Sequence, residues 1–278
     1  MNYKIIGDSC TDLTADLKKD EHIELVPLSI HIDNETIVDD ETFDQKEFIR
    51  KMEASPNCPK SSCPSPEAYM NAFSEEGDQY VVTLSSSLSG SYNSAELAKK
   101  LYLEEHPGRN IAVFDSKAAS VAQTLIVMKI KEYIESGHPF EKVVEQINHF
   151  IEELNTKFVL ESLETLRKNG RLSNLKAIIA SALNIKPVMG ATKEGTIYKI
   201  DQARGINKAL KLMATTIVQD VIDPENKILG IAHCNNYERA LYIKEEILKL
   251  VKFKSVFIAD TAGIASLYAN EGGIIVAY

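Results

Sequence analysis

The sequence predicts an α/β protein made of two α/β domains, the first of them with a mainly parallel sheet. Three short apolar runs, at residues 3–7, 80–84 and 111–114, have the length and composition of strands. Segments with helical periodicity, at 92–103 and 119–134, follow the second and third runs. Strands that alternate with helices in this way are typical of parallel sheets with right-handed crossovers.

The chain between the first two strands is less regular. A β-like stretch covers 25–32 and ends in a turn at 33–35, and a helix is expected at 44–52. A proline-rich loop at 55–66 then leads into a helix at 66–73. Long loops in compact domains are usually functional, although a rigid connector is the simpler interpretation.

We place a domain boundary near residue 155, where a helix expected at 140–154 ends and the pattern changes. The predicted domains are residues 1–155 and 156–278. The second domain is expected to contain strands at 158–160, 185–189, 196–200, 228–232, 256–258 and 274–277, and helices at 162–168, 175–183, 206–218 and 237–250.

Composition and motifs exclude several classes of function. The 278 residues carry a formal net charge of −9 with no basic stripe, which argues against a nucleic-acid surface or a polybasic membrane patch. No apolar run approaches the roughly 20 residues of a membrane span. The four cysteines form no CxxC pair, and no signal-peptide pattern opens the chain, so we expect a cytoplasmic protein.

The chemistry-bearing side chains give no catalytic or metal constellation. None of the six histidines lies in a catalytic motif, and we find no metal-ligand spacing, no G-x-G-x-x-G and no Walker lysine. The pattern Ser173-x-x-Lys176 is too short to support a serine/lysine hydrolase. We therefore expect no catalytic residue, no metal and no nucleotide cofactor.

The most informative stretch is the hydroxyl-rich turn at 85–91, between a predicted strand and a predicted helix. Serine hydroxyls and backbone N–H groups that meet at a helix N-terminus can hold a carboxylate or a phosphate. Ser89 is the prime candidate, and Gly90 lets the backbone approach a ligand closely. The alternative is that Ser89 only caps the helix. Ser61 and Ser62, ahead of the helix at 66–73, could present hydroxyls at a second helix start, and the alternative there is a polar loop.

A cationic segment at 167–173 carries Arg171 next to a helix-stop glycine. It is either a solvated loop or a docking point for a phosphate or a protein partner.

Five segments, in this order and spacing, resemble the DegV family of fatty-acid-binding proteins, some of which are the lipid-carrying subunit of bacterial fatty acid kinase. Residues 7–13 look like the family's D-S-x-x-D-L opening, and residues 60–65 its T-S-Q-P-S loop. Residues 85–92 are close to S-S-x-L-S-G-T-Y, the most specific of the motifs. Residues 166–173 resemble G-G-R-[IL]-S, and residues 185–187 read I-K-P.

The resemblance implies that Ser61 and Ser89 hold the carboxylate of a long-chain fatty acid, with backbone help from Ser62 and Gly90. The acyl chain would lie in the cleft between the two domains. The resemblance also places Arg204 near the ligand or the kinase partner. Burying about fifteen methylenes yields roughly 12 kcal/mol before association costs, which favours a lipid over a small polar acid.

The chain departs from the family near its end. Kinase-coupled members have an H-T-G-P-G-like segment whose histidine lies near the carboxylate. Matching Gly273 to the last glycine of that motif puts Ala269 at the histidine, and leaves Tyr268 and Asn270 as possible hydrogen-bonding neighbours. The departure affects phosphoryl transfer more than fatty acid binding.

We therefore predict a carrier that presents its bound fatty acid to an ATP-dependent kinase subunit for acyl-phosphate formation. Two alternatives remain open: a serine hydrolase or acyltransferase that uses Ser89, and a lipid-binding scaffold without a kinase role.

Overall fold

The computed structural model describes residues 2–172 and 184–278. We call residues 2–155 the N-terminal unit and the described residues from 156 onward the C-terminal unit. The helix expected at 175–183, Ser173 and the Ser173–Lys176 pattern lie outside the described residues.

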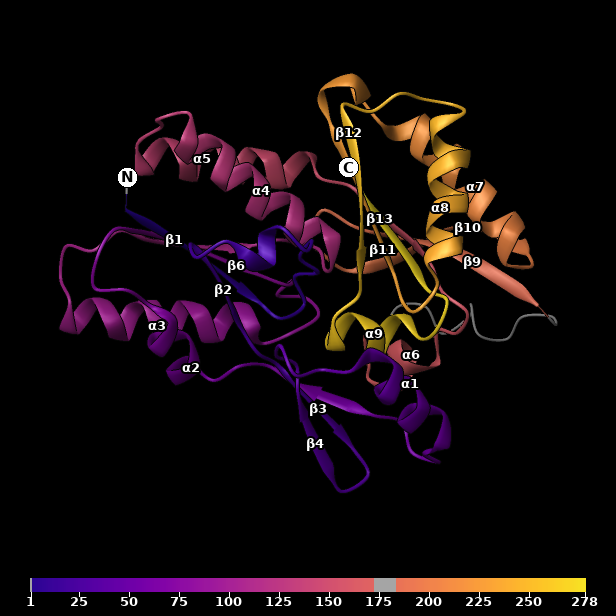
Figure 1. The fold of residues 1–278 in the computed structure, drawn as a ribbon, viewed down its shortest axis with the longest axis horizontal. Helices are drawn as coiled ribbons and strands as arrows, with labels where there is room; N and C mark the ends of the chain where they lie inside the picture. Colours follow the sequence, from indigo (N-terminus) through magenta and orange to yellow (C-terminus); the bar gives the residue numbers. More distant parts are fainter. Residues whose placement is uncertain (1, 173–183) are drawn as a thin grey trace.

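The N-terminal unit is built on a parallel sheet in the order β2-β1-β6-β7. Its strands are β1 (Tyr3–Asp8), β2 (Ile23–Val26), β6 (Asp78–Thr83) and β7 (Ile111–Asp115). Helices α2 (Pro66–Ala72) and α3 (Ser91–Glu105) cover one face, and α4 (Val121–Glu135) and α5 (Phe140–Glu153) cover the other (Figure 1). The predicted α/β class and parallel first sheet are confirmed.

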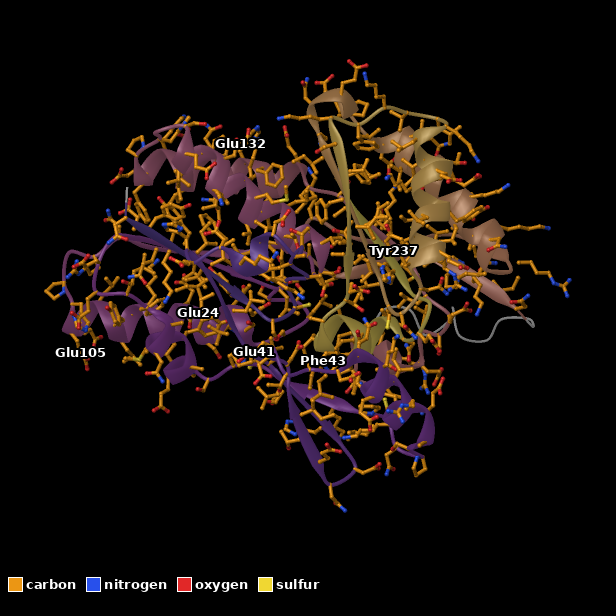
Figure 2. All side chains as sticks on the ribbon, viewed as in Figure 1. Glu24, Glu41, Phe43, Glu105, Glu132 and Tyr237 are labelled. Carbon is orange, nitrogen blue, oxygen red and sulfur yellow. The ribbon has the colours of Figure 1, made fainter. Side chains whose placement is uncertain are left out.

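The alternation of side chains along the strands explains these layers. Ile5 packs toward α4 and α5, whereas its neighbour Ile6 packs toward α2 and α3. Both faces of the strands are therefore apolar, as parallel sheets require. Charged side chains such as Glu105 and Glu132 lie on the outer surface of the helices (Figure 2).

A small antiparallel sheet, in the order β4-β3-β5, projects from the N-terminal unit (Figure 1). It contains β3 (Ser29–Ile32), β4 (Glu35–Val38) and β5 (Lys60–Ser62), and α1 (Gln45–Ala54) lies between β4 and β5 in the chain. The β-like stretch expected at 25–32 is thus two strands in two sheets. Pro27 separates them, because proline has no N–H with which to continue a ladder.

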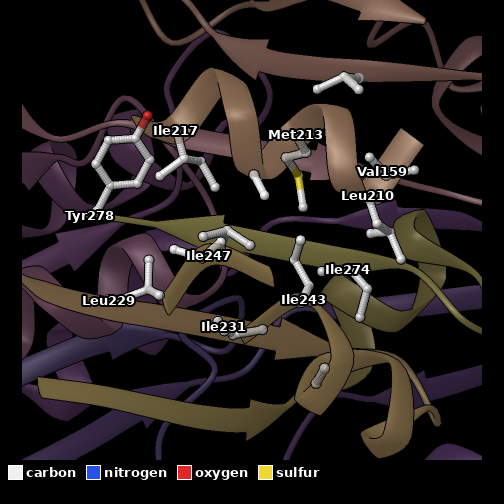
Figure 3. Close-up of a cluster of buried hydrophobic side chains, with 14 of the residues drawn as sticks. Val159, Leu210, Met213, Ile217, Leu229, Ile231, Ile243, Ile247, Ile274 and Tyr278 are labelled. Atoms are coloured by element: carbon white, nitrogen blue, oxygen red, sulfur yellow. The ribbon is translucent and has the colours of Figure 1, made fainter. Parts of the chain in front are cut away.

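The C-terminal unit is built on a mixed sheet in the order β10-β9-β8-β13-β11-β12. Helices α7 and α8 cover one face, and their apolar side chains meet those of the sheet in the core of Figure 3. Helix α4 of the N-terminal unit packs on β11 and β13. The strands are β8 (Thr156–Val159), β9 (Ile185–Ala191), β10 (Ile197–Arg204), β11 (Ile228–His233), β12 (Ser255–Asp260) and β13 (Ile274–Ala277), and the helices are α6 (Glu164–Lys168), α7 (Ile206–Asp220), α8 (Tyr237–Leu248) and α9 (Gly263–Ala269). Short 3₁₀ turns lie at Leu17–Lys19 and Pro224–Asn226.

Candidate functional site

The hydroxyl-rich turn joins β6 to α3 at the carboxyl edge of the parallel sheet. The N-cap of α3 is Gly90, which has no side chain with which to cap. Ser89 is half-buried, and its Oγ accepts the N–H of Ser91 at 3.2 Å. A hydroxyl that accepts one bond still has a proton to donate. Ser89 can therefore donate to an acceptor in the cavity that it lines.

Two other serines of the turn reach across to the C-terminal unit. Ser85 Oγ donates to the carbonyl oxygen of Gly195 at 2.8 Å, and Ser87 Oγ donates to that of Glu194 at 2.7 Å. These hydroxyls attach the turn to the loop between β9 and β10. The crowding of serines in the sequence therefore has a structural component as well as a candidate binding component.

The remaining two serines act within the N-terminal unit. Ser86 Oγ donates to Asp115 Oδ2 at 2.5 Å. Ser91 is fully buried, where its Oγ donates to Asp8 Oδ2 at 2.6 Å and lies 2.6 Å from the hydroxyl of Tyr69. Ser89 is thus the serine of the turn that lines the cavity.

A second hydroxyl reaches the same cavity from the small sheet. Ser61 on β5 lines the cavity, and its Oγ lies 2.8 Å from the hydroxyl of Tyr268 on α9. The next residue, Ser62, is exposed, and its Oγ lies 3.0 Å from His31 Nε2. Neighbouring residues of a strand point to opposite faces. The side chain of Ser62 therefore points away from the candidate site, and its predicted contribution is limited to its backbone.

Arg171 brings a positive charge to this part of the cavity. It lines the cavity, its Nε donates to the carbonyl oxygen of Leu88 at 3.1 Å, and a second guanidinium nitrogen donates to that of Asn169 at 2.5 Å. The guanidinium lies 5.8 Å from the ring centroid of Tyr268, a cation–π distance. Arg171, which the sequence suggested for partner docking, is therefore next to the two serines.

The backbone conformation near the end of α9 favours aligning the histidine of the family motif with Tyr268, whereas the sequence alignment placed it at Ala269. Asn270 and Gly272 have φ of 57° and 79°, a conformation that favours glycine. Two glycines lie two and four residues after the histidine in H-T-G-P-G, so this match puts Tyr268 at the histidine. Tyr268 indeed contacts Ser61, whereas Ala269 adds only an apolar surface to the cavity.

The cavity lies between the two units and has a volume of about 100 Å³. Beyond its polar end its walls are mainly aliphatic, which suits a hydrocarbon chain. The apolar lining comes from the segments that follow β1, β2, β6 and β7 in one unit and from the sheet, α6 and α9 in the other: Cys10, Leu28, Leu84, Leu88, Ala118, Ala119, Phe158, Leu160, Leu166, Ala191, Ile197, Ile264, Ala265, Ala269 and Ile275.

Besides Ser62, three predicted site residues lie outside this lining as the described residues form it. Gly90 is exposed behind Ser89, and an added Cβ there would lie 3.1 Å from Cys63 Sγ. The amide of Asn270 donates to the carbonyl oxygen of Tyr268 at 3.2 Å, which shapes the end of α9. Arg204 is exposed at the end of β10.

Lys117 and helix α9 are parts of the site that the sequence did not reveal. Lys117 lines the cavity in a positive-φ turn, with φ of 55°, after β7. Helix α9 carries Tyr268, but its residues are nearly all buried, so the sequence shows no amphipathic pattern there.

Two buried carboxylates of the N-terminal unit hold the start of α9. Asp12 accepts the N–H of Ala262 at 2.6 Å, and Asp39 accepts those of Gly263 at 2.6 Å and Ile264 at 2.9 Å. Carboxylates stabilise helix N-termini, where backbone N–H groups lack helical partners. These contacts fix α9, and with it Tyr268, against the N-terminal unit.

Burial changes the protonation of both carboxyl groups. Loss of water raises the pKa of Asp12 to about 7, although hydrogen bonds from Ser120 and Ala262 oppose the rise. The same cause raises the pKa of Asp39 to about 6, opposed by the backbone bonds from α9. Both groups therefore titrate near neutral pH.

Other kinds of site find little support in the described structure. Within residues 2–172 and 184–278, no group of three or more histidine, cysteine or acidic side chains is placed to hold a metal ion. In the same ranges no helix is both long and apolar enough to cross a bilayer. Among the described residues that line the cavity there is no histidine that would act as a base for Ser89.

Comparison with known proteins gives a consistent result. The DegV family model matches residues 2–278. A DegV domain-containing protein of Streptococcus gordonii is 35% identical over 280 residues, which cover 100% of this chain and 99% of the relative.

Two solved structures are similar over nearly their whole length. A DegV family protein of Ruminococcus gnavus, refined with vaccenic acid, is 49% identical with a TM-score of 0.97, and 99% of each chain is covered. The fatty acid kinase B3 protein of Streptococcus pneumoniae, loaded with linoleic acid, is 34% identical with a TM-score of 0.91, covering 100% of this chain and 99% of the other. The protein described here thus belongs to the DegV family.

Proposed function

We propose that this protein binds one long-chain fatty acid in the cavity between its units and presents the carboxylate to a kinase partner. The observation that carries the proposal is that Ser61 and Ser89, from separate elements, both line one cavity whose walls are mainly apolar. The fatty acids in the Ruminococcus gnavus and Streptococcus pneumoniae structures support the choice of ligand.

The hydrogen-bond geometry suits a carboxylate, which only accepts. The Tyr268 hydroxyl, 2.8 Å from Ser61 Oγ, donates to Ser61, so that Ser61 can direct its own proton to the ligand. Ser89 donates to the second carboxylate oxygen. Arg171 supplies the positive charge that a partly buried carboxylate needs. Tyr268 thereby takes over the hydrogen bond of the family's histidine.

The kinase role is the finer part of the proposal. The sequence has no G-x-G-x-x-G and no Walker lysine, so phosphorylation of the carboxylate needs an ATP-binding partner that brings its own catalytic groups. The fatty acid kinase B3 protein of Streptococcus pneumoniae supports such a partnership. Arg204, exposed at the end of β10, is the candidate contact for that partner.

The first experiment is extraction of the purified protein with organic solvent, followed by mass spectrometry and by binding of added oleate. We expect one fatty acid per protein. A protein that carries no fatty acid and takes up none would refute the proposal. A phosphonate probe tests the hydrolase alternative, since labelling of Ser89 requires an activated nucleophile. Assay with a fatty acid kinase subunit and ATP separates the carrier from the scaffold, because only the carrier yields acyl-phosphate.

The hydroxyls are tested by substitution within one turn. Ser89→Ala should weaken oleate binding about tenfold, because a hydrogen bond to a charged acceptor is lost. Ser86→Ala is the matched control: the same hydroxyl is removed from the same turn, but its partner is Asp115 in the same unit. Ser87→Ala should also weaken binding less than Ser89→Ala does. Equal losses for Ser89 and Ser86 would mean that Ser89 does not hold the carboxylate.

A further inference from the structure

One wall of the cavity is a seam between a turn and a hairpin. The serine turn of the N-terminal unit meets the loop at 192–196, which joins β9 to β10. Gly195, Ala191 and Ile197 of this hairpin line the cavity, as do Leu84 and Leu88 of the turn. Moving the hairpin away from the turn would therefore open the cavity along its side.

Two neutral hydrogen bonds hold this seam. They are the bonds from Ser85 Oγ to Gly195 and from Ser87 Oγ to Glu194 described above. The fit is close, because a Cβ on Gly195 would lie 2.1 Å from Ser85 Oγ and 2.9 Å from the Cα of Lys117. These two bonds and the close contact at Gly195 attach the tip of the hairpin to the turn.

The position of the hairpin in its sheet leaves it able to move. Strand β10 is at the edge of the sheet, and the hairpin tip at 191–197 extends beyond Met189 and Gly190, where β9 pairs with β8. The other contacts between the units are stronger, since α4 packs its apolar face on β11 and β13 and buried carboxylates hold α9. Local opening occurs where few apolar contacts and few bonds must break.

We propose that the tip of the β9–β10 hairpin, residues 191–197, is the door through which the acyl chain enters and leaves the cavity, with the Ser85 and Ser87 bonds as its latch. This inference rests on the proposed function for the identity of the ligand. The door moves away from the turn to expose the apolar part of the cavity, and it returns to cover the bound chain. The carboxylate site on Ser61, Ser89 and Tyr268 stays intact, because those residues belong to other elements.

The test uses a natural reporter inside the cavity. Cys10 lines the cavity and is 2% exposed, whereas Cys234 is fully buried and is not among the residues that line the cavity. Alkylation of Cys10 by iodoacetamide, followed by peptide mass spectrometry, measures opening of the cavity. Alkylation of Cys234 in the same sample measures unfolding of the C-terminal unit. Burial raises the pKa of the Cys10 thiol, so all variants are compared at one pH.

Two variants open the latch, and each has a matched control. Ser87→Ala removes one bond across the seam and should raise the Cys10 rate about fivefold. Its control is Ser86→Ala, which loses a bond within the N-terminal unit. Gly195→Ala displaces both bonds and should raise the rate about 25-fold. Its control is Gly137→Ala, which has a similar φ of 81° against 77° but nothing within 4 Å of the added Cβ.

If the door exists, Cys10 is alkylated faster in the two latch variants than in the unmodified protein. The two controls show no change, and Cys234 is alkylated slowly in every variant. The door is overturned if Cys10 is alkylated no faster in the latch variants than in their controls. It is also overturned if the alkylation rate of Cys234 rises in parallel with that of Cys10. Added oleate should protect Cys10 in the unmodified protein. If oleate protects Cys10 but the latch variants are alkylated no faster than their controls, only the door is rejected. If the latch variants are alkylated faster but the protein neither binds oleate nor is protected by it, the proposed function is rejected.

Discussion

Two of the polar contacts between the units differ in strength, and the difference assigns them different roles. At α9, the buried carboxylates of Asp12 and Asp39 accept backbone N–H groups. At the β9–β10 hairpin, the hydroxyls of Ser85 and Ser87 donate to backbone carbonyls. Bonds to a charged group are about twice as strong as neutral ones, and Asp39, whose pKa is about 6, is mainly charged at pH 7. We call the first contact the carboxylate seam and the second the hydroxyl seam.

The carboxylate seam fixes the polar end of the cavity, because α9 carries Tyr268 and Tyr268 orients Ser61. The hydroxyl seam borders the apolar part of the cavity, which has to open for a long chain to pass. A carrier needs a rigid grip on the head group and a movable wall for the tail. Each seam can be weakened separately by substitution of its residues.

The largest effect is expected at Asp39. Asp39→Ala leaves the N–H groups of Gly263 and Ile264 without their acceptor, and should lower the free energy of unfolding by about 3 kcal/mol. Urea unfolding followed by circular dichroism measures this loss. Asp39→Asn keeps an acceptor oxygen and should recover part of it.

Asp40→Ala is the matched control for this prediction. Asp40 is the next residue along the chain, and its carboxylate accepts bonds from Thr42 near the surface. Its removal should cost less than about 1 kcal/mol, as is usual for surface contacts. If Asp39→Ala were no more harmful than Asp40→Ala, the carboxylate seam would not be the stronger of the two.

Much of the fold was predictable because its elements obey local rules. The parallel strands β1, β6 and β7 and the helices that follow them were expected within a few residues, since both apolar runs and helical periodicity are local signals. The short strand at Lys60–Ser62 was expected to be loop, because it exists only through pairing with β3. Helix α9 was not expected, because it is short and buried on nearly all sides.

The site was predictable only in part. Ser61 and Ser89 were selected from their motifs, and the structure brings both to one cavity. The proximity of Arg171 to Tyr268 joins segments about a hundred residues apart, which a single sequence cannot reveal. The match at Tyr268 depends on the backbone φ of Asn270, which is a property of the folded chain. The partners of Ser85 and Ser87 are likewise visible only in the structure.

The next largest effect is a change in pH dependence at Asp12. Its pKa is raised to about 7 by burial, so the folded state keeps a proton that the unfolded state loses near pH 4. Stability should therefore fall as pH rises from about 4 to about 7 and then level off. Asp12→Asn is uncharged at every pH and can still accept from Ala262, so it should reduce this fall by on the order of 2 kcal/mol.

Thermal and urea unfolding at pH 4, 5.5, 7 and 8 measures the slope for both proteins. Asp16→Asn is the control, since Asp16 is exposed and its substitution should leave the slope unchanged. If stability depends on pH equally in Asp12→Asn and in the unmodified protein, the Asp12 carboxyl is not the group whose titration changes the stability.

The smallest effect on stability is expected at the hydroxyl seam. Ser87→Ala should lower the free energy of unfolding by no more than about 1 kcal/mol, because water can replace a neutral bond at an exposed residue. Ser86→Ala should cost a similar amount, since it also loses one bond of an exposed serine. The two variants should therefore be alike in urea unfolding while differing in Cys10 alkylation. If Ser87→Ala instead destabilised the protein as much as Asp39→Ala, the hairpin would be a structural support, and a wall that must open for the acyl chain would have to lie elsewhere.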